Sequence, residues 1–320
     1  MGMGTFVEEV DVLISQQCDV SHSAEASASS ALFDGQLGLW SAIRAVNVPA
    51  MKAGYQGERE SYSYRVAGEL LPDAERVGFA SFAAAFHALA DKDVDRLVLP
   101  IENSTTGSVL PVLDRLVAAP ASIIAESVLE VRHALLGVAG SDVGDVKTVR
   151  SHPEALGQAE ELLLERGWEA VATHDTAGAV REVAEMGDAT QAALAPPESG
   201  EAHGLEVLLS DVIDRHHNTT RFVVLAPGDP QVDADDDKTS IAFETSHTAG
   251  ALALVLTELG LRGANLTRIE SRPSIEQWRY RFFVDFVHPP GAAGLGQVLE
   301  PPPATIANLY VLGSYRSAMA

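Results

Sequence analysis

The chain has 320 residues, 46% of them hydrophobic and 21% charged, which is enough for two globular domains with ordinary buried cores. Its net charge of −23 argues against binding to nucleic acid or anionic membranes, and its single cysteine, Cys18, excludes an internal disulfide and a cysteine-cluster metal site. Because no run approaches the roughly 20 apolar residues of a membrane helix and the first residues lack a secretory signal, we expect a cytoplasmic protein.

Residues 1–52 differ in pattern from the rest of the chain. An acidic stretch at 7–11 and a run of small residues at 21–30 lack the apolar periodicity of packed elements. We expect an N-terminal extension of unknown role, with the natural start of the first folded domain near Met51.

Residues 53–226 alternate between short apolar strands and helical patterns, which is typical of an α/β fold. A buried strand is predicted at 96–101. Pro153 is predicted to lie at a helix start, and the helix carries an apolar stripe formed by Ala155, Leu156, Ala159, Leu162 and Leu163. Late strands are predicted at 205–209 and 221–225. Another helix is predicted where apolar residues recur at a spacing of three or four, at Phe82, Ala85, Phe86 and Leu89.

Residues 227–238 are predicted to form an acidic linker. Turn-forming residues at 227–230 are followed by Asp235, Asp236 and Asp237, like charges that we expect neither to pack nor to pair.

Residues 239–320 are predicted to form a second, smaller α+β domain. Strands and helices follow in the order β-α-β-β-(α)-β, which is that of a ferredoxin-like module. In its third strand, at 278–287, side chains alternate between two faces. The prolines at 301–303 require the second helix to be short.

Five motifs carry polar residues in an order and at spacings that resemble one known family. They are Tyr55-Gln56-Gly57-Glu58 with Tyr62-Ser63; Pro100-Ile101-Glu102-Asn103-Ser104 with Gly107-Ser108-Val109; Ser151-His152-Pro153 with Ala155-Leu156 and Gln158; Asn218-Thr219-Thr220-Arg221-Phe222; and Glu270-Ser271-Arg272-Pro273. Together they resemble the prephenate dehydratase family over residues 53–315.

The resemblance implies a two-lobed α/β catalytic domain at 53–226, similar to periplasmic binding proteins, with the active site between the lobes. It also implies a ferredoxin-like ACT regulatory domain at 239–320. The implied reaction converts prephenate to phenylpyruvate, CO2 and water, and needs no cofactor or metal because aromatisation drives it. The implied partners are prephenate, phenylalanine as an allosteric effector and further copies of the chain in a homodimer or homotetramer.

Catalysis in this family is assigned to the threonine before Arg-Phe, which is Thr220 here. A hydroxyl is a weak acid, so we interpret its role as a preorganised hydrogen-bond donor to the departing hydroxide. Glu102 and His152 are better matched in pKa for donating a proton and stay alternative proton sources.

Arg221 presents a planar guanidinium suited to a carboxylate. Holding the carboxylate that leaves would stabilise the reactant, so the expected target is the retained pyruvyl carboxylate. In a regular strand Thr220 and Arg221 face opposite sides, so both serve the cleft only if the chain bends there. Otherwise Arg221 is structural.

Further substrate-binding residues are expected at strand ends and helix starts. Asn103 and Ser104 follow a buried strand, where open α/β sheets place ligands, although Ser104 to Ser108 could instead cap the next helix. Ser151 precedes a helix whose free N–H groups favour an anion. Gly57 and Ser63 belong to the first motif.

A phenylalanine site is implied in the C-terminal domain, at a dimer interface. The loop before its first helix and its second strand would supply Gly250, Ala251, Leu252, Asn265, Leu266, Glu270, Ser271 and Arg272.

Two alternatives stay open. An arogenate dehydratase would perform the same chemistry on an aminated side chain. A non-catalytic amino-acid sensor would keep the cleft only as a binding site.

Overall fold

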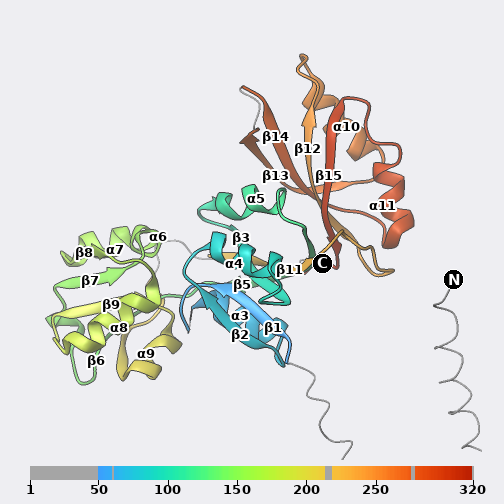
Figure 1. Cartoon of the computed structure of the whole chain (residues 1–320). Coiled ribbons are helices and arrows are strands. Elements are labelled where there is room, and N and C mark those ends of the chain that lie inside the picture. The colour runs from blue at the N-terminus through green and yellow to red at the C-terminus, as the bar shows by residue number, and fades with distance from the viewer. Residues whose placement is uncertain (1–49, 60, 213–217, 275–277, 319–320) are drawn as a thin grey trace, which may run out of the picture. The chain divides into compact units, whose positions relative to one another are not determined.

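The structure, a computed structural model, describes residues 50–59, 61–212, 218–274 and 278–318 (Figure 1). The predicted N-terminal extension therefore lies outside the described residues except for 50–52. Residues from Ala50 onward group into one unit, in which we distinguish a first lobe, a second lobe and a C-terminal module. No helix in the described ranges is long and apolar enough to cross a membrane.

The first lobe is built on one part of a large mixed sheet, and the C-terminal module contributes the other part (Figure 1). Its strands lie in the order β5-β11-β3-β1-β2, with β4 paired to β3; β1 is parallel to β2 and β3, and β11 is antiparallel to β3 and β5. Its elements are β1 (Lys52–Gln56), α3 (Tyr62–Leu70), β2 (Glu75–Phe79), α4 (Phe82–Ala90), β3 (Arg96–Asn103), β4 (Gly107–Ser108), α5 (Leu110–Leu116), β5 (Ala121–Glu130) and β11 (Thr219–Pro227).

Alternate residues of the first-lobe strands face different helices. Leu97 and Leu99 of β3 share a core with α4 and α5, whereas Val98 between them packs with α3. This is the two-residue period of a strand covered on both faces. The face predicted for the helix at 82–89 is confirmed, since Ala85, Phe86 and Leu89 are buried in α4.

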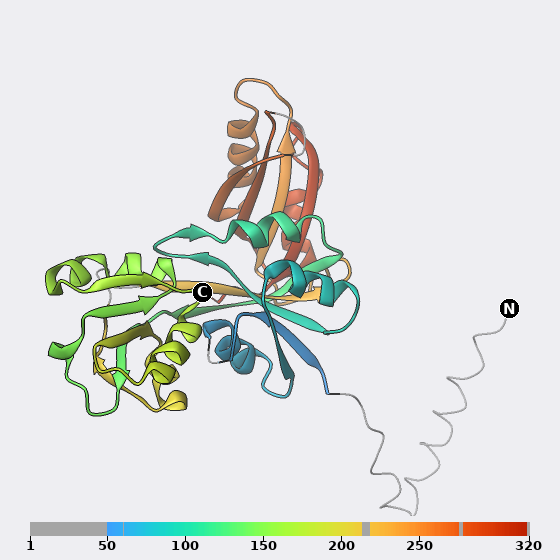
Figure 2. The same cartoon turned by 60° about the vertical axis from the view of Figure 1, so that its left-hand side comes forward.

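The second lobe has its own sheet, in the order β10-β6-β9-β7-β8, with helices on both faces (Figure 2). Leu135 and Leu194 pack with α6 and α7, whereas Leu136 and Ala193 pack with α8. Its elements are β6 (Ala134–Val138), η1 (Val143–Asp145), β7 (Thr148–Ser151), α6 (Pro153–Gln158), α7 (Glu160–Arg166), β8 (Glu169–Ala172), α8 (Thr176–Met186), β9 (Gln191–Ala195), α9 (Pro197–His203) and β10 (Leu205–Leu209).

The prediction of one helix from Pro153 is wrong in one respect. It begins at Pro153 as expected, but it is two helices, α6 and α7, separated at Ala159, whose φ of −118° and ψ of 18° are not helical. The apolar stripe survives the break, because Leu156, Ala159 and Leu163 lie in the same buried core.

The C-terminal module has the predicted order of strands and helices, that of a ferredoxin-like fold. Its antiparallel strands lie in the order β13-β14-β12-β15. Its elements are β12 (Lys238–Thr245), α10 (Ala251–Leu261), β13 (Asn265–Pro273), β14 (Tyr280–Val287), α11 (Gly291–Leu299) and β15 (Ile306–Tyr315). The second helix, α11, ends before the three prolines, as expected.

Both faces of β14 are buried. Val284 and Phe286 pack against α10 and α11, whereas Phe283 joins the core of the first lobe. The alternation predicted for 278–287 therefore sorts residues between two cores. Trp278 lies outside the strand and is 78% exposed.

The first lobe and the C-terminal module share one sheet. β15 runs parallel to β5 at Gly313 and Ile123. A Cβ atom on residue 313 would lie 2.2 Å from the Ile123 carbonyl oxygen, so this approach requires glycine.

The predicted linker at 227–238 is only partly confirmed. Its last residues both pack and pair, because Asp236 is 9% exposed, Lys238 is 1% exposed, and Asp237 accepts a hydrogen bond from the Ser317 N–H. The expectation that these charges neither pack nor pair is wrong, since β12 begins inside a buried polar cluster.

Candidate active site

A cleft between the two lobes collects most of the polar motifs. It has a larger part of about 790 Å³ and a smaller part of about 240 Å³. Residues that line both parts are Gln56, Tyr62, Asn103, His152, Glu154, His174, Asp175, Thr176 and Thr220.

Thr220 and Asn103 lie side by side in this cleft on the paired strands β11 and β3. The Asn103 amide nitrogen donates to the Thr220 hydroxyl oxygen at 2.9 Å. The Asn103 side-chain oxygen Oδ1 accepts the Thr105 and Thr106 N–H groups at 2.9 and 3.1 Å, which fixes the orientation of the side-chain amide. Since Asn103 occupies a lone pair of the threonine oxygen, the Thr220 proton is left to donate elsewhere.

A chain of side-chain amides continues from Asn103 into the second lobe. Asn103 donates to Asn218 at 2.7 Å, and Asn218 donates to Gln158 of α6 at 2.8 Å. Thr106 adds a second link by donating to Glu154 at 2.6 Å. These bonds hold the two lobes together around Thr220.

His152 lies at the cleft, as predicted. It caps α6, with Nδ1 accepting the Glu154 N–H at 3.2 Å. This bond places the proton of a neutral imidazole on Nε2, so His152 offers a donor as long as Nδ1 serves as the cap.

His133 and Tyr62 also line the cleft, and the sequence analysis did not single them out as functional. His133 is 4% exposed, and burial lowers its pKa to about 4 although a hydrogen bond with Gln158 opposes the shift. Burial raises the pKa of Tyr62, whose hydroxyl donates to the Arg132 carbonyl oxygen. In the sequence, His133 could have been noticed only as a histidine directly before the apolar residues of β6.

Arg221 and Glu102 do not reach the cleft, which corrects two predictions. Arg221 is 3% exposed and donates to Glu102 at 3.1 Å on the face of the sheet opposite Thr220. β11 shifts its pairing register with β3 only after Arg221, so residues 220 and 221 keep the alternation of a regular strand. Glu102 points away from the cleft for the same reason, since its neighbour Asn103 points into it.

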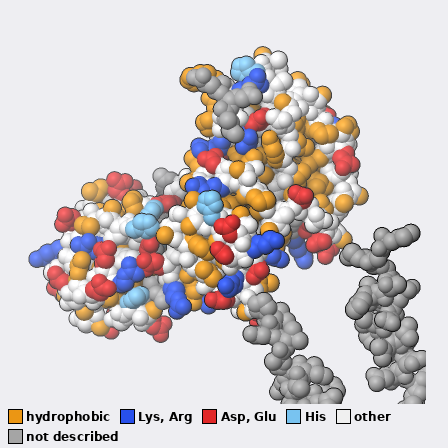
Figure 3. All heavy atoms as spheres, in the orientation of Figure 1, with side chains coloured by type: hydrophobic (Ala, Val, Ile, Leu, Met, Phe, Trp, Pro, Cys, Tyr) orange, Lys and Arg blue, Asp and Glu red, His pale blue; other side chains and the backbone are white. Residues whose placement is uncertain are grey.

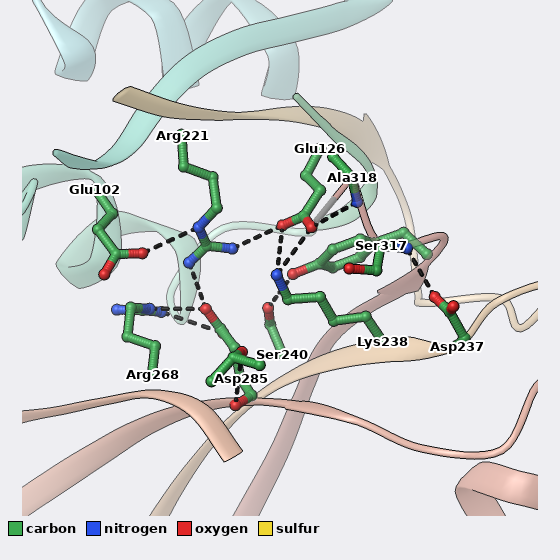
Figure 4. A network of polar contacts seen from close by, with 12 residues as sticks. Glu102, Glu126, Arg221, Asp237, Lys238, Ser240, Arg268, Asp285, Ser317 and Ala318 are labelled. Carbon is green, nitrogen blue, oxygen red and sulfur yellow. Dashed lines mark hydrogen bonds and ion pairs between the residues drawn. The ribbon is translucent and has the colours of Figure 1, made fainter. Parts of the chain in front are cut away.

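Arg221 belongs instead to a buried charge cluster that joins the first lobe to the C-terminal module (Figure 4). It donates to Glu126 of β5 at 2.9 Å and to Asp285 of β14. Asp285 also accepts from Arg268 at 2.7 Å, and Lys238 donates to Glu126 at 2.8 Å. The cluster is balanced, with the acids Glu102, Glu126 and Asp285 and the bases Arg221, Lys238 and Arg268.

The charges of this cluster depend on one another. Burial alone would raise the pKa of Asp285, but Arg268 and Arg221 hold it well below its ordinary value. Burial alone would lower the pKa of Arg221, but its acidic neighbours, Asp285 above all, hold it higher.

Two predicted serines are structural, whereas two other predicted residues line the cleft. Ser151 is fully buried and donates to the Leu194 carbonyl oxygen, and Ser104 accepts the Thr219 N–H at 2.9 Å. Neither is among the described residues that line the cleft, so both substrate-binding predictions are corrected. Ser63 and Gly57 do line it, and Gly57 has a φ of 109°, which favours glycine.

The cleft combines one cationic side chain, Arg115, with two carboxylates, Glu154 and Asp175, and with several helix starts. The helices α3, α4 and α8 begin at it, capped by Ser61, Ser81 and Asp175. Helix starts attract anions. Arg115 is the only lysine or arginine among the described residues that line the cleft, and no sequence motif marks it.

The residues predicted for an effector site are divided. Gly250, Ala251 and Leu252 line a cavity of about 220 Å³ in the C-terminal module. The β13 residues Asn265, Leu266, Glu270, Ser271 and Arg272 do not line it. Arg272 instead donates twice to Asp114 of α5, at 3.1 and 2.7 Å.

A family model and the curated relatives that match this chain point to one family. A family model described as prephenate dehydratase matches residues 53–230. An Arabidopsis thaliana protein named arogenate dehydratase/prephenate dehydratase 2, chloroplastic, is 37% identical over 252 residues, covering 75% of this chain and 66% of that protein. The chain spans 64–66% of the length of the first curated relatives that it matches.

Solved structures are similar over most of the chain. One of a prephenate dehydratase from Arthrobacter aurescens, in complex with L-Phe, has a TM-score of 0.72 at 26% identity, covering 84% of this chain and 91% of that one. A protein described as a novel type of quorum-quenching acylase has a TM-score of 0.73 at 28% identity, covering 83% and 97%.

Proposed function

The chain belongs to the prephenate dehydratase family, and from that premise we propose that it converts prephenate to phenylpyruvate, CO2 and water in phenylalanine biosynthesis. The prephenate dianion loses its ring carboxylate as CO2, and the electron pair of that C–C bond enters the ring. The ring C–O bond breaks with its pair on oxygen, which leaves as hydroxide and is protonated to water. Phenylpyruvate keeps one negative charge, so atoms and charge balance.

The observation that carries the proposal is the oriented hydroxyl of Thr220. Its oxygen accepts from Asn103, so its own proton can donate to the ring hydroxyl as negative charge develops there. A preorganised donor of this kind is worth about 10²–10³ in kcat. His152 also lies in the cleft, whereas Glu102 does not, so His152 is the proton source that we propose.

Arg115 is proposed to take the role first predicted for Arg221. The pyruvyl carboxylate is unchanged by the reaction, so a cation that holds it binds substrate without opposing the loss of CO2. Arg115 lies in the last turn of α5, donates to the Pro111 carbonyl oxygen at 2.8 Å and lines the cleft.

The same geometry argues against acyl transfer. An acylase needs a nucleophile activated by an adjacent base. The group beside the Thr220 oxygen is an amide that donates to it, which cannot remove its proton.

We further propose that the C-terminal module is an ACT domain that binds phenylalanine and lowers activity. Its topology fits, and Gly250, Ala251 and Leu252 line a cavity of a size suited to a small ligand. Hydrophobic side chains gather over this module (Figure 3), with Leu254, Leu261 and Ile269 between 47% and 84% exposed. Such a surface supports assembly into a homodimer or homotetramer.

The test is to mix the purified full chain with prephenate, or with arogenate, and to follow phenylpyruvate or phenylalanine. We expect the wild-type protein to turn over prephenate. Thr220→Val should reduce this turnover at least about 100-fold, whereas Thr220→Ser should retain much of it. Turnover of arogenate alone would favour the arogenate dehydratase. Binding of either acid without turnover would favour the non-catalytic sensor.

A further inference from the structure

Glu154 places a carboxylate without a cationic partner on the wall of the cleft. It lies in the first turn of α6, is exposed, and lines both parts of the cleft together with Thr220. Its Oε1 accepts the Thr106 hydroxyl at 2.6 Å, whereas Oε2 accepts no hydrogen bond from the described residues. Among these residues, none of the ion pairs that involve the second lobe includes Glu154.

The other charged side chains of the cleft do not serve the same purpose. Both carboxylate oxygens of Asp175 are engaged, since Oδ1 accepts the Gly178 N–H at 2.6 Å and Oδ2 lies 3.2 Å from His174 Nδ1. Arg115 is a cation and suits a substrate carboxylate. Glu154 is therefore the acid of the cleft that has an oxygen available for a ligand.

Prephenate has no group that matches an available carboxylate by charge. Its two carboxylates are negative and its keto group is neutral, so Glu154 repels it. Arogenate carries an ammonium group in place of the keto oxygen, and an ammonium group donates three hydrogen bonds. Loss of CO2 and, with one added proton, of water converts arogenate to phenylalanine and leaves the ammonium group unchanged. A carboxylate that binds this group therefore does not oppose the reaction.

Glu154 is connected to Thr220 by a short series of hydrogen bonds. Thr106, which donates its hydroxyl to Glu154, donates its N–H to Asn103 at 3.1 Å, and Asn103 donates to Thr220 at 2.9 Å. Two side chains thus lie between the carboxylate and the catalytic hydroxyl. This separation suits a substrate whose ring hydroxyl and amino-acid side chain lie at opposite ends of a six-membered ring.

We propose that Glu154 is a specificity-determining residue that binds the ammonium group of an aminated substrate, so that the cleft dehydrates arogenate as well as prephenate. This rests on the proposed function, because both substrates lose the same groups beside Thr220.

The test is Glu154→Gln, which removes the charge and keeps an oxygen that can accept from Thr106. The KM for arogenate is expected to rise about 10- to 100-fold, with kcat within about threefold of wild type, because the ammonium group is bound equally before and during the reaction. For prephenate, kcat/KM is expected to rise about two- to tenfold, because a repulsive charge is lost. Opposite changes for the two substrates cannot come from general damage to the cleft.

The matched control is Glu160→Gln. Glu160 is an exposed acid at the first position of α7 and is not among the described residues that line the cleft. It tests whether any loss of negative charge from this part of the second lobe changes the preference. Because solvent screens exposed charges, the ratio of the two kcat/KM values should stay within about twofold of wild type.

A binding measurement makes the test independent of turnover. It uses two unreactive analogues with a saturated ring, one with the keto acid side chain and one with the amino acid side chain. Calorimetry gives the dissociation constant of the keto analogue, and displacement of that analogue gives the constant of the amino analogue, which confines the comparison to one site. Glu154→Gln is expected to reduce the preference for the amino analogue about tenfold or more.

An unchanged preference in Glu154→Gln, in turnover and in binding, would overturn the inference. A wild-type protein that turns over prephenate but neither turns over nor binds the aminated acids would overturn it as well and would leave the proposed function intact. Failure of the proposed function looks different, because neither substrate is then turned over, and the ratio of the two dissociation constants alone decides whether Glu154 recognises the ammonium group.

Discussion

The side-chain amide of Asn103 donates to the hydroxyl oxygen of Thr220 across the β3–β11 pair. In Asn103→Asp the donor becomes a carboxylate oxygen, and the Thr220 proton is expected to turn toward it and away from the cleft. We predict a fall in kcat of about 10²-fold with little change in KM, measured by steady-state kinetics on prephenate.

A double variant separates this effect from general damage. Thr220→Val already lacks the proton that Asn103 orients, so adding Asn103→Asp should cost little more. Multiplied losses in the double variant would contradict a shared role for the two side chains.

The cluster around Arg221 leads to a prediction about stability. Asp285→Asn removes one negative charge and leaves Arg221 and Arg268 buried with too few acids. Removing one partner from a buried ion pair costs about 3–5 kcal/mol, so the free energy of unfolding in urea should fall by about that amount.

The matched control is Glu69→Gln in the exposed pair Arg65–Glu69, whose side chains are 46% and 50% exposed. Exposed pairs are worth about 0–1 kcal/mol, so this variant should be close to wild type. Similar losses in both variants would show that burial of the cluster contributes nothing.

The sequence predicted the strands and helices better than the direction of individual side chains. Thr220 and Asn103 were identified by their motifs, and both lie in the cleft. The alternation of side chains along a strand already indicated that Arg221 faces the side of the sheet opposite Thr220. The same rule, applied to Asn103, would have turned Glu102 away from the cleft as well.

Other residues could not be found from local pattern. His133 reaches the cleft only because the chain crosses from β5 to β6 beside Gln158 of α6, a contact between distant segments. Ser151 looks like a helix-start ligand in sequence, but its hydroxyl is taken by the Leu194 carbonyl oxygen of β9. Both outcomes depend on tertiary packing.

His133 also predicts how stability depends on pH. Its pKa is lowered to about 4 in the folded protein, whereas an unfolded chain has a value of about 6.5. Between these values the unfolded chain binds the extra proton, so the free energy of unfolding falls as pH drops from about 6.5 toward 4. Because of His133, the free energy of unfolding should be lower by about 2–3 kcal/mol at pH near 4.5, and this loss should be absent above pH near 7.

The measurement is urea unfolding at both pH values for wild type and His133→Asn. The variant lacks this titration, so its loss of stability on acidification should be smaller by about 2–3 kcal/mol. Parallel losses would show that His133 is not held neutral by burial.

The Arg272–Asp114 contact predicts a route from the C-terminal module to the cleft. Arg272 lies in β13, and Asp114 lies in α5, whose first residues Leu110 and Pro111 line the cleft together with Arg115. If phenylalanine acts through this contact, Asp114→Asn should raise the concentration needed for half inhibition about 5- to 50-fold, the range of ordinary allosteric coupling. Activity without phenylalanine should stay within about twofold of wild type, and stability within about 1 kcal/mol, because the pair is 26% and 46% exposed.

The control is Glu165→Gln on the exposed side of α7, which neutralises an acid far from α5 and should leave inhibition unchanged. Inhibition curves that coincide for wild type and Asp114→Asn would rule the contact out as the route.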